Sequence, residues 1–173
     1  GAAQYYRDAK ILTIYEGTTA IQANDLVGRK TARDGGQTAQ AIAAQVEKTE
    51  AELAARDSVP ARAVAKRLTA ARKAFLDVVG YVVQHGKGSP NAVFAGSVPY
   101  LMLAGNLVAG WQMARSLLAA EDLLQKGQDA EFMRAKIATA RFYAEHILAK
   151  APGVRDSIVE GAESVTSLPL EAF

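Results

Sequence analysis

The chain has 173 residues, half of them hydrophobic, so it can bury a sizeable core without disulfides or a structural metal. Its 20 lysines and arginines are nearly balanced by 18 aspartates and glutamates, and the net charge of +2 is too small to hold a nucleic acid. Cysteine is absent, which excludes disulfides, thiolate nucleophiles and cysteine metal sites, and fits the reducing cytoplasm, where we expect the protein.

Two segments bear on targeting and membranes. Residues 1–10 are polar and lack the apolar middle of a secretory signal. Residues 89–114 carry no charge and are nearly long enough to span a bilayer, but they contain two prolines and the polar residues Asn91, Asn106 and Gln112, which are costly in hydrocarbon. We therefore expect no membrane span, and we interpret this stretch as part of a central helix that is buried on most sides.

In chain order, the first expected helix is a short one over residues 19–30. Thr19 and Gln22 have the spacing of a capping box, in which a hydroxyl and an amide satisfy exposed backbone N–H groups at a helix start. A longer helix is expected over residues 37–56, after the flexible Asp34-Gly35-Gly36. Its inward residues are expected to be Ile42, Val46, Thr49 and Leu53.

The clearest helical periodicity follows Pro60, which suits a first helical turn, and it ends at Gly86-Lys87-Gly88. The apolar stripe of this helix contains Val64, Leu68, Ala71, Phe75, Val78, Val79 and Val82. Charged and polar residues, among them Arg62, Lys73 and Gln84, lie opposite. The pattern predicts a helix with one buried face.

Two more long helices are expected, over residues 98–126 with Gly127 as the stop, and over 129–150 with Pro152 and Gly153 as the stop. The first half of the former is apolar nearly all round and should lie in the middle of the fold. The inward face of the latter is expected to contain Phe132, Ala135, Phe142, Tyr143 and Ile147. A shorter helix over 154–164 and an apolar tail over 168–173 would follow.

No strand or hairpin pattern occurs in the sequence. Four long helices with short connections therefore predict an all-α fold, an up-and-down antiparallel helical bundle preceded by a loop-and-helix segment.

Residues outside the N-terminal segment offer few candidates for chemistry. His85 and His146 are too few for a histidine metal site, no metal-binding spacing surrounds them, and we expect His146 to be a core residue. Lys136 lies within the apolar arc of the expected helix over 129–150. Its aliphatic stem can cover apolar surface while its ammonium group reaches water, so this position indicates no reactive amine. Trp111 is interpreted as a core residue. Glycine loops that bind nucleotides are absent.

Residues 4–29 read QYYRDAKILTIYEGTTAIQANDLVGR. The runs 7–11 and 14–18, followed by Ile21, Gln22 and Arg29, resemble the C-terminal signature of acyl-CoA dehydrogenases. The remaining sequence, including its ending SLPLEAF, resembles the extra helical domain of the longer bacterial members. The resemblance implies that residues 1–34 end the family's C-terminal domain, with its catalytic loop and last helix, and that 35–173 form an additional helical bundle domain.

The resemblance also implies a reaction, the α,β-dehydrogenation of an acyl-CoA thioester with FAD as hydride acceptor. Glu16 corresponds to the general base, and drying of its surroundings by bound substrate would raise its proton affinity. Tyr15 and Gly17 are implied to touch substrate. Thr18, Thr19 and Gln22, where a helix begins, are implied to contact the flavin dinucleotide. No metal is implied.

The implied partners are the acyl-CoA substrate, the remainder of the enzyme, a second copy in a homodimer, and an electron-transfer flavoprotein or similar acceptor. Because most of the flavin site would lie upstream, we expect the isolated chain to be inactive. The bundle would then have a structural and assembly role. The alternative is a non-catalytic helical interaction module whose Tyr15–Thr18 turn is accidental, and replacement of Glu16 distinguishes the two.

Overall fold

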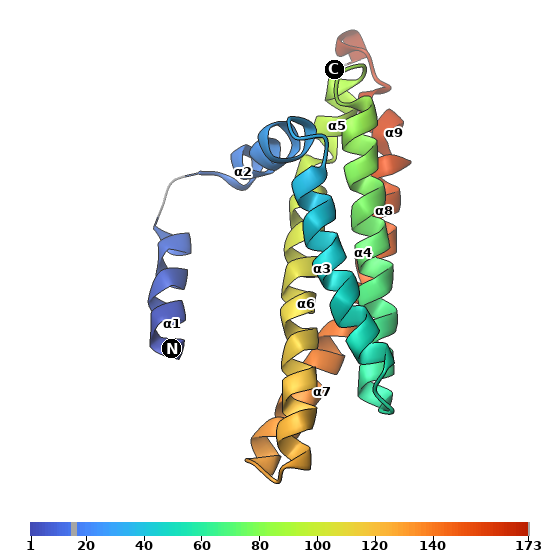
Figure 1. The fold of residues 1–173 in the computed structure, drawn as a ribbon. Coiled ribbons are helices and arrows are strands. Elements are labelled where there is room, and N and C mark those ends of the chain that lie inside the picture. The colour runs from blue at the N-terminus through green and yellow to red at the C-terminus, as the bar shows by residue number, and fades with distance from the viewer. Residues whose placement is uncertain (15–16, 173) are drawn as a thin grey trace.

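The computed structural model describes residues 1–14 and 17–172, and these ranges are helical with no strand. Figure 1 shows a bundle whose long helices run alternately down and up. Its arms are α3 (Gln37–Ala54), α4 (Val59–His85), α6 (Ser97–Gln125) and a fourth arm made of α7 (Ala130–His146), η3 (Leu148–Lys150) and α8 (Ala151–Val159). The predicted all-α, up-and-down antiparallel bundle is confirmed.

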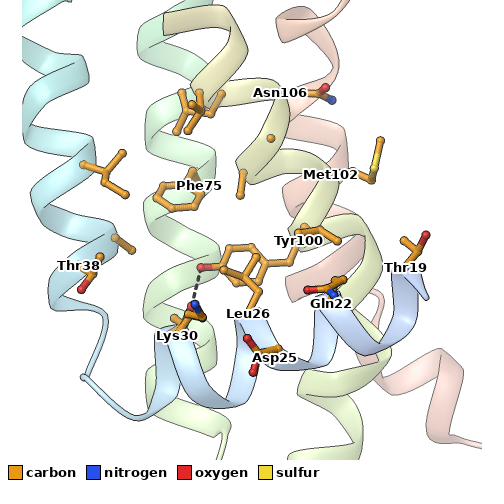
Figure 2. A pocket seen from close by; sticks show the side chains of 18 of the residues that line it. Thr19, Gln22, Asp25, Leu26, Lys30, Thr38, Phe75, Tyr100, Met102 and Asn106 are labelled. Atoms are coloured by element: carbon orange, nitrogen blue, oxygen red, sulfur yellow. Dashed lines mark hydrogen bonds between the residues drawn. The ribbon is translucent and has the colours of Figure 1, made fainter. Parts of the chain in front are cut away.

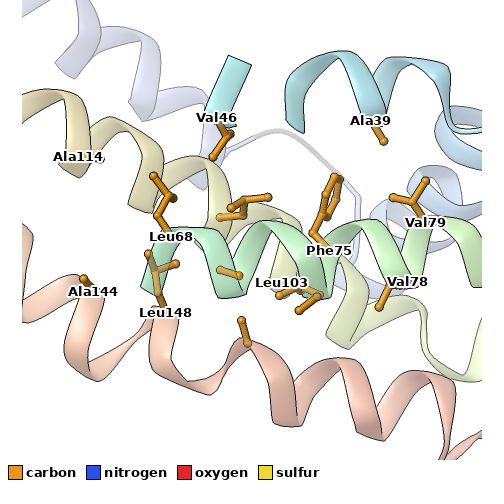
Figure 3. Close-up of a cluster of buried hydrophobic side chains, with 14 of the residues drawn as sticks. Ala39, Val46, Leu68, Phe75, Val78, Val79, Leu103, Ala114, Ala144 and Leu148 are labelled. Atoms are coloured by element: carbon orange, nitrogen blue, oxygen red, sulfur yellow. The ribbon is translucent and has the colours of Figure 1, made fainter. Parts of the chain in front are cut away.

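Helix α4 lies at the centre of the bundle and packs on α3, α6, α7 and α8. It begins where Ser58 Oγ accepts the N–H of Ala61 at 3.1 Å, and Pro60 lies in its first turn. Every residue of its predicted apolar stripe is buried, and Figure 3 shows several of them meeting side chains of the neighbouring helices. The periodicity therefore predicted both the helix and its buried face.

Helix α3 begins at the predicted residue and packs along α4. Gly35 and Gly36 precede it with φ of +65° and +78°, a region that glycine adopts without strain. The carboxylate of Asp34 accepts the N–H groups of Gly36 and Thr38 at 2.9 and 3.0 Å. These bonds satisfy donors at the helix start, and a further hydrogen bond from the Thr38 side chain lowers the pKa of Asp34.

A buried ion pair joins α3 to α4. Arg72 donates to the two carboxylate oxygens of Glu50 at 2.7 and 2.9 Å, and Thr69 donates to the same carboxylate at 2.8 Å. Nearby, the indole N–H of Trp111 donates to Thr49 Oγ1 at 2.8 Å. Because each buried polar group has a partner, these residues fix the register of α3, α4 and α6 and form no open site.

The central apolar stretch departs from prediction in one way. Residues Pro90–Ala95 form a separate short helix, α5, before α6 begins at Ser97. Helix α6 packs against α2, α3, α4, α7 and α8, so it is covered on most sides as expected, but one stripe stays open, with Val98, Met102 and Val108 37%, 55% and 40% exposed. No other element of the described chain covers that stripe.

The predicted inward face of α7 was wrong in part. Tyr143 packs against the core as expected, but Phe132 and Phe142 are 50% and 59% exposed, whereas Ala140 and Ala144 are buried. The small side chains allow α7 to approach α6 closely, and the rings turn outward. His146 is likewise exposed and stacks on Phe142, with ring centroids 4.5 Å apart, so it is not a core residue.

The expected stop at Pro152 also has a different position. Helix α7 ends at His146, before the proline, and a short 3₁₀ turn leads into α8. Pro152 lies in the first turn of α8, where its missing N–H costs no helical hydrogen bond. The chain then ends in α9 (Ala162–Thr166) and η4 (Leu170–Ala172).

The N-terminal segment contains α1 (Ala2–Lys10), η1 (Ile11–Thr13), α2 (Thr19–Asp25) and the π-helix η2 (Leu26–Ala32). Helix α2 is capped by Thr18, whose Oγ1 accepts the N–H of Ile21 at 3.3 Å. The predicted Thr19 cap is therefore displaced by one residue, because Thr18 is the residue with extended backbone at the helix start.

Among the described residues, no helix combines the length and apolarity needed to cross a membrane.

Candidate functional site

An open groove of about 1070 Å³ lies between α2, α3 and α6, and we call it the α2–α3–α6 groove. Figure 2 shows how its side chains converge from the three elements that give it this name, with η2 continuing the wall begun by α2. Its apolar lining includes Leu26, Ala39, Ile42, Phe75, Tyr100, Leu101, Ala104, Leu107 and Val108. The groove is an apolar trough with a polar rim.

The floor of the groove is held by one buried hydrogen bond. Thr31 Oγ1 lies 2.9 Å from the hydroxyl oxygen of Tyr100, and both residues are 1% exposed. The Tyr100 ring stacks on Phe75 with centroids 5.9 Å apart. Burial raises the pKa of Tyr100, so the phenol stays neutral at physiological pH. This bond ties η2, and with it the N-terminal segment, to α6.

Polar side chains form the rim. Thr19, Gln22, Asp25 and Lys30 come from α2 and η2, and Thr38 comes from α3 on the opposite side. They mix hydroxyl, amide, carboxylate and ammonium groups, so the rim has no single sign of charge. In the part of the chain that the structure describes, no three His, Asp or Glu residues gather to hold a metal ion.

Gly17 lines this groove just before α2 begins. Gly17 has φ of +154°, and a Cβ there would collide with the side-chain amide of Gln22, which folds back over the glycine. Gly17, Thr19 and Gln22 all line the groove. Glycine adopts this backbone conformation without strain. Because it has no Cβ, no side chain covers the backbone of Gly17 where it lies next to the Gln22 side-chain amide.

The structure thus brings together Gly17, Thr19 and Gln22 at the start of α2. Thr18 stands between them, and its side chain is engaged as the helix cap. Tyr15 and Glu16, the predicted substrate-contacting and catalytic residues, lie outside the described residues.

Sequence reasoning did not find the other two walls of the groove. Residues such as Ile42, Tyr100 and Ala104 are distant in sequence and have the pattern of ordinary helical core positions. The only sequence signal was the unusual apolarity of residues 98–110, which exceeds what a one-sided helix needs.

Comparisons with known proteins agree with the resemblance noted in the sequence. Residues 38–169 match the family model described as acetyl-CoA dehydrogenase C-terminal like. The chain is 49% identical over 170 residues to 3-methylmercaptopropionyl-CoA dehydrogenase of Ruegeria pomeroyi, an alignment that covers 98% of this chain and 29% of that protein.

Two further relatives are more distant. The chain is 33% identical over 187 residues to the broad-specificity linear acyl-CoA dehydrogenase FadE5 of Mycobacterium tuberculosis, covering 98% of this chain and 29% of that protein. It is 31% identical over 176 residues to a butyryl-CoA dehydrogenase of Syntrophomonas wolfei, covering 99% and 28%. The chain thus spans less than a third of the length of these relatives. With three quarters of its residues inside the family match, the chain belongs to the acetyl-CoA dehydrogenase C-terminal like family.

Proposed function

We propose that this chain is the C-terminal part of a flavin-dependent acyl-CoA dehydrogenase of the cytoplasm. The observation that carries the proposal is the 49% identity over 98% of the chain to an acyl-CoA dehydrogenase, an alignment long enough to include the signature turn. In this proposal residues 1–34 end the family's C-terminal domain and residues 35–173 form an additional bundle.

The reaction is the removal of two hydrogens from an acyl-CoA thioester. Glu16 takes the proton from the carbon next to the thioester carbonyl, and FAD, when bound, accepts the hydride from the neighbouring carbon. A carboxylate becomes a stronger base when substrate excludes water from it, because desolvation disfavours its charged form. Tyr15 flanks the acyl chain.

The residues around the turn fit these ligands. The bare backbone edge at Gly17 allows a thioester to approach closely, since no Cβ projects there. Thr19 and Gln22 present a hydroxyl and an amide to the groove, which suit the oxygen and nitrogen atoms of a flavin dinucleotide, and Thr18 orients them through its cap. An electron-transfer flavoprotein or similar acceptor completes the cycle.

The decisive substitution is Glu16→Gln in the full-length enzyme. Loss of the base lowers kcat by about 100- to 10,000-fold while the melting temperature stays unchanged. Glu163→Gln, the same chemical change at an exposed carboxylate of α9, is the matched control and leaves kcat unchanged. If Glu16→Gln retains activity, the non-catalytic interaction module is the better description.

The 173-residue chain alone is expected to be inactive with added FAD and acyl-CoA. A base without a positioned substrate and acceptor does not catalyse. Spectrophotometric assay of the purified chain tests this, and turnover of any acyl-CoA would contradict it.

The bundle has a structural and assembly role in the same proposal, in an enzyme that forms a homodimer. The apolar tail over residues 168–173, in which Leu168 is 63% exposed, supports this because a run of apolar residues favours packing on a neighbouring surface. Removal of residues 168–173 from the full-length enzyme is expected to weaken its assembly in sedimentation experiments. Unchanged assembly and melting would argue against the role. Phe173 itself lies outside the described residues.

A further inference from the structure

The α2–α3–α6 groove is wide and open to solvent. Its volume of about 1070 Å³ lies at the upper end of the range for small-molecule pockets, about 300 to 1,000 Å³. Its lining is mainly apolar, with Phe75 and Tyr100 at its floor. A trough of this size and chemistry is suited to side chains of another protein surface.

Several apolar side chains in and near the groove are exposed. Met102 and Val108, which line it from α6, are 55% and 40% exposed, and Ile21 on α2, outside the lining, is 60% exposed. On the far side of the signature turn, Leu12 lines the groove and is 70% exposed. Contiguous apolar surface of this kind marks an interaction site, because leaving it in water is unfavourable.

The backbone of α6 is accessible in the same place. Gly105 lines the groove, and a Cβ built there meets no atom within 4 Å. Together with Ala104, it leaves α6 without a bulky side chain at the middle of the trough. Another helix can therefore approach to the short interaxial distances of about 8 to 10 Å that small residues permit.

Two observations indicate what fills the groove. Gly17 and the α2 residues Thr19 and Gln22 line the groove, so it includes residues that the proposed function places at substrate and flavin. The dehydrogenases that this chain resembles extend far beyond it, since the alignments cover only 28% or 29% of their lengths.

We propose that the α2–α3–α6 groove binds the flavin-bearing part of the same dehydrogenase, which inserts the apolar face of a helix between α2 and α6. The inference rests on the proposed function and deepens it, because it assigns the surface through which this chain contacts the flavin-bearing part of the enzyme. The apolar face of α6 is then covered, which explains why its sequence is apolar nearly all round.

The test is Gly105→Trp, with Gly80→Trp as the matched control. Both glycines are exposed within long helices, and a Cβ added at either one would meet no atom within 4 Å, but Gly80 lies on α4 outside the groove. In the isolated chain, both variants keep the wild-type melting behaviour. In the full-length enzyme, calorimetry shows the bundle melting together with the rest in wild type and in Gly80→Trp. In Gly105→Trp the bundle melts separately, at the temperature of the isolated chain.

Two outcomes would overturn the proposal. A full-length Gly105→Trp enzyme that melts as wild type overturns the proposal. An isolated wild-type chain that is dimeric in sedimentation, and becomes monomeric with Gly105→Trp, also overturns it by making the groove an interface between copies. If Gly105→Trp prevents the isolated bundle from folding, Met102→Glu replaces it, since that side chain is already half exposed.

Failure of the inference and failure of the proposed function are separate results. Glu16→Gln reports on catalysis by kcat, and Gly105→Trp reports on contact by melting. An active Glu16→Gln enzyme in which Gly105→Trp still uncouples the bundle leaves the groove assignment intact and removes only the catalytic one.

Discussion

The Thr31–Tyr100 pair is the buried hydrogen bond between η2 and α6, beside the apolar contacts that α2 and η2 make with the bundle. Its two hydroxyls lie 2.9 Å apart at the floor of the groove, where water cannot replace either partner. Thr31→Val leaves the Tyr100 hydroxyl buried without that partner, and we expect a cost of about 1 to 3 kcal/mol in the free energy of unfolding. Urea denaturation measures it.

A double-mutant cycle provides the control. The combined Thr31→Val and Tyr100→Phe variant is expected to lose less stability than the sum of the single variants, because removing both hydroxyls leaves neither unsatisfied. Strict additivity would show that the two hydroxyls do not interact in solution.

Tyr100 also predicts a dependence of stability on alkaline pH. Burial raises the pKa of Tyr100 above its ordinary value of 10.0, so the folded state retains the phenolic proton more strongly than the unfolded state. Its contribution to stability is therefore complete below pH 10 and is lost as the pH rises through the raised pKa.

The corresponding measurement is the free energy of unfolding between about pH 8 and pH 11. Tyr100→Phe is expected to flatten the alkaline decline relative to wild type. Tyr5→Phe, which removes the same hydroxyl from a side chain that is 79% exposed, is the matched control and should leave the decline unchanged. An equally steep decline in Tyr100→Phe would contradict the assignment.

At the scale of helices, the contact between α6 and the fourth arm depends on a glycine. A Cβ at Gly110 would lie 2.6 and 2.8 Å from the two terminal carbons of Leu148 in η3. Leu148 is 1% exposed and fully packed, so it has no free space into which to move. The absence of a side chain at Gly110 therefore sets how closely α6 and η3 approach.

Gly110→Ala is expected to destabilise the protein by about 1 to 3 kcal/mol through overpacking, although alanine is the better helix former. Gly105→Ala, on the same helix but facing open space, is expected to stabilise it by about 0.4 to 1 kcal/mol. Chemical denaturation of the two variants tests the contrast. Equal effects on the free energy of unfolding would mean that Leu148 in η3 can move away from the added methyl group without destabilising the protein.

The errors about α7 belong to the same scale. A helical stripe of Phe132, Phe142 and Ile147 has the pattern of a buried face, and the stripe of Ala140 and Ala144 beside it has less apolar area. Periodicity identifies an apolar arc but cannot decide between two overlapping arcs. Because α7 packs closely against α6, the alanine stripe is the one that is buried.

For the molecule as a whole, α1 is set apart from the bundle (Figure 1). Helix α1 contacts η1 and has no buried residue, while its Tyr5 and Tyr6 are 79% and 81% exposed. A nine-residue helix without tertiary contacts is marginal in water. We therefore expect two levels of stability along the chain.

Amide hydrogen exchange of the 173-residue chain measures this difference. Amides of residues 2–13 are expected to exchange nearly unprotected, and those in the centre of α4 are expected to exchange only on global unfolding. Deletion of residues 1–14 is expected to change the unfolding free energy by less than about 0.5 kcal/mol. Strong protection of α1 would show that it docks on the bundle or on another copy.

The sequence by itself determined the all-α class, the extents of α3 and α4, the buried stripe of α4 and the resemblance carried by the signature turn. These are local properties, since periodicity, caps and short motifs depend on residues within a few turns of each other. Only the tertiary structure decided which face of α6 stays open, that α7 packs through Ala140 and Ala144, and that Gly17, Thr19 and Gln22 line a groove walled by α3 and α6. These depend on contacts between residues far apart in sequence, where packing and close approach outweigh the local pattern.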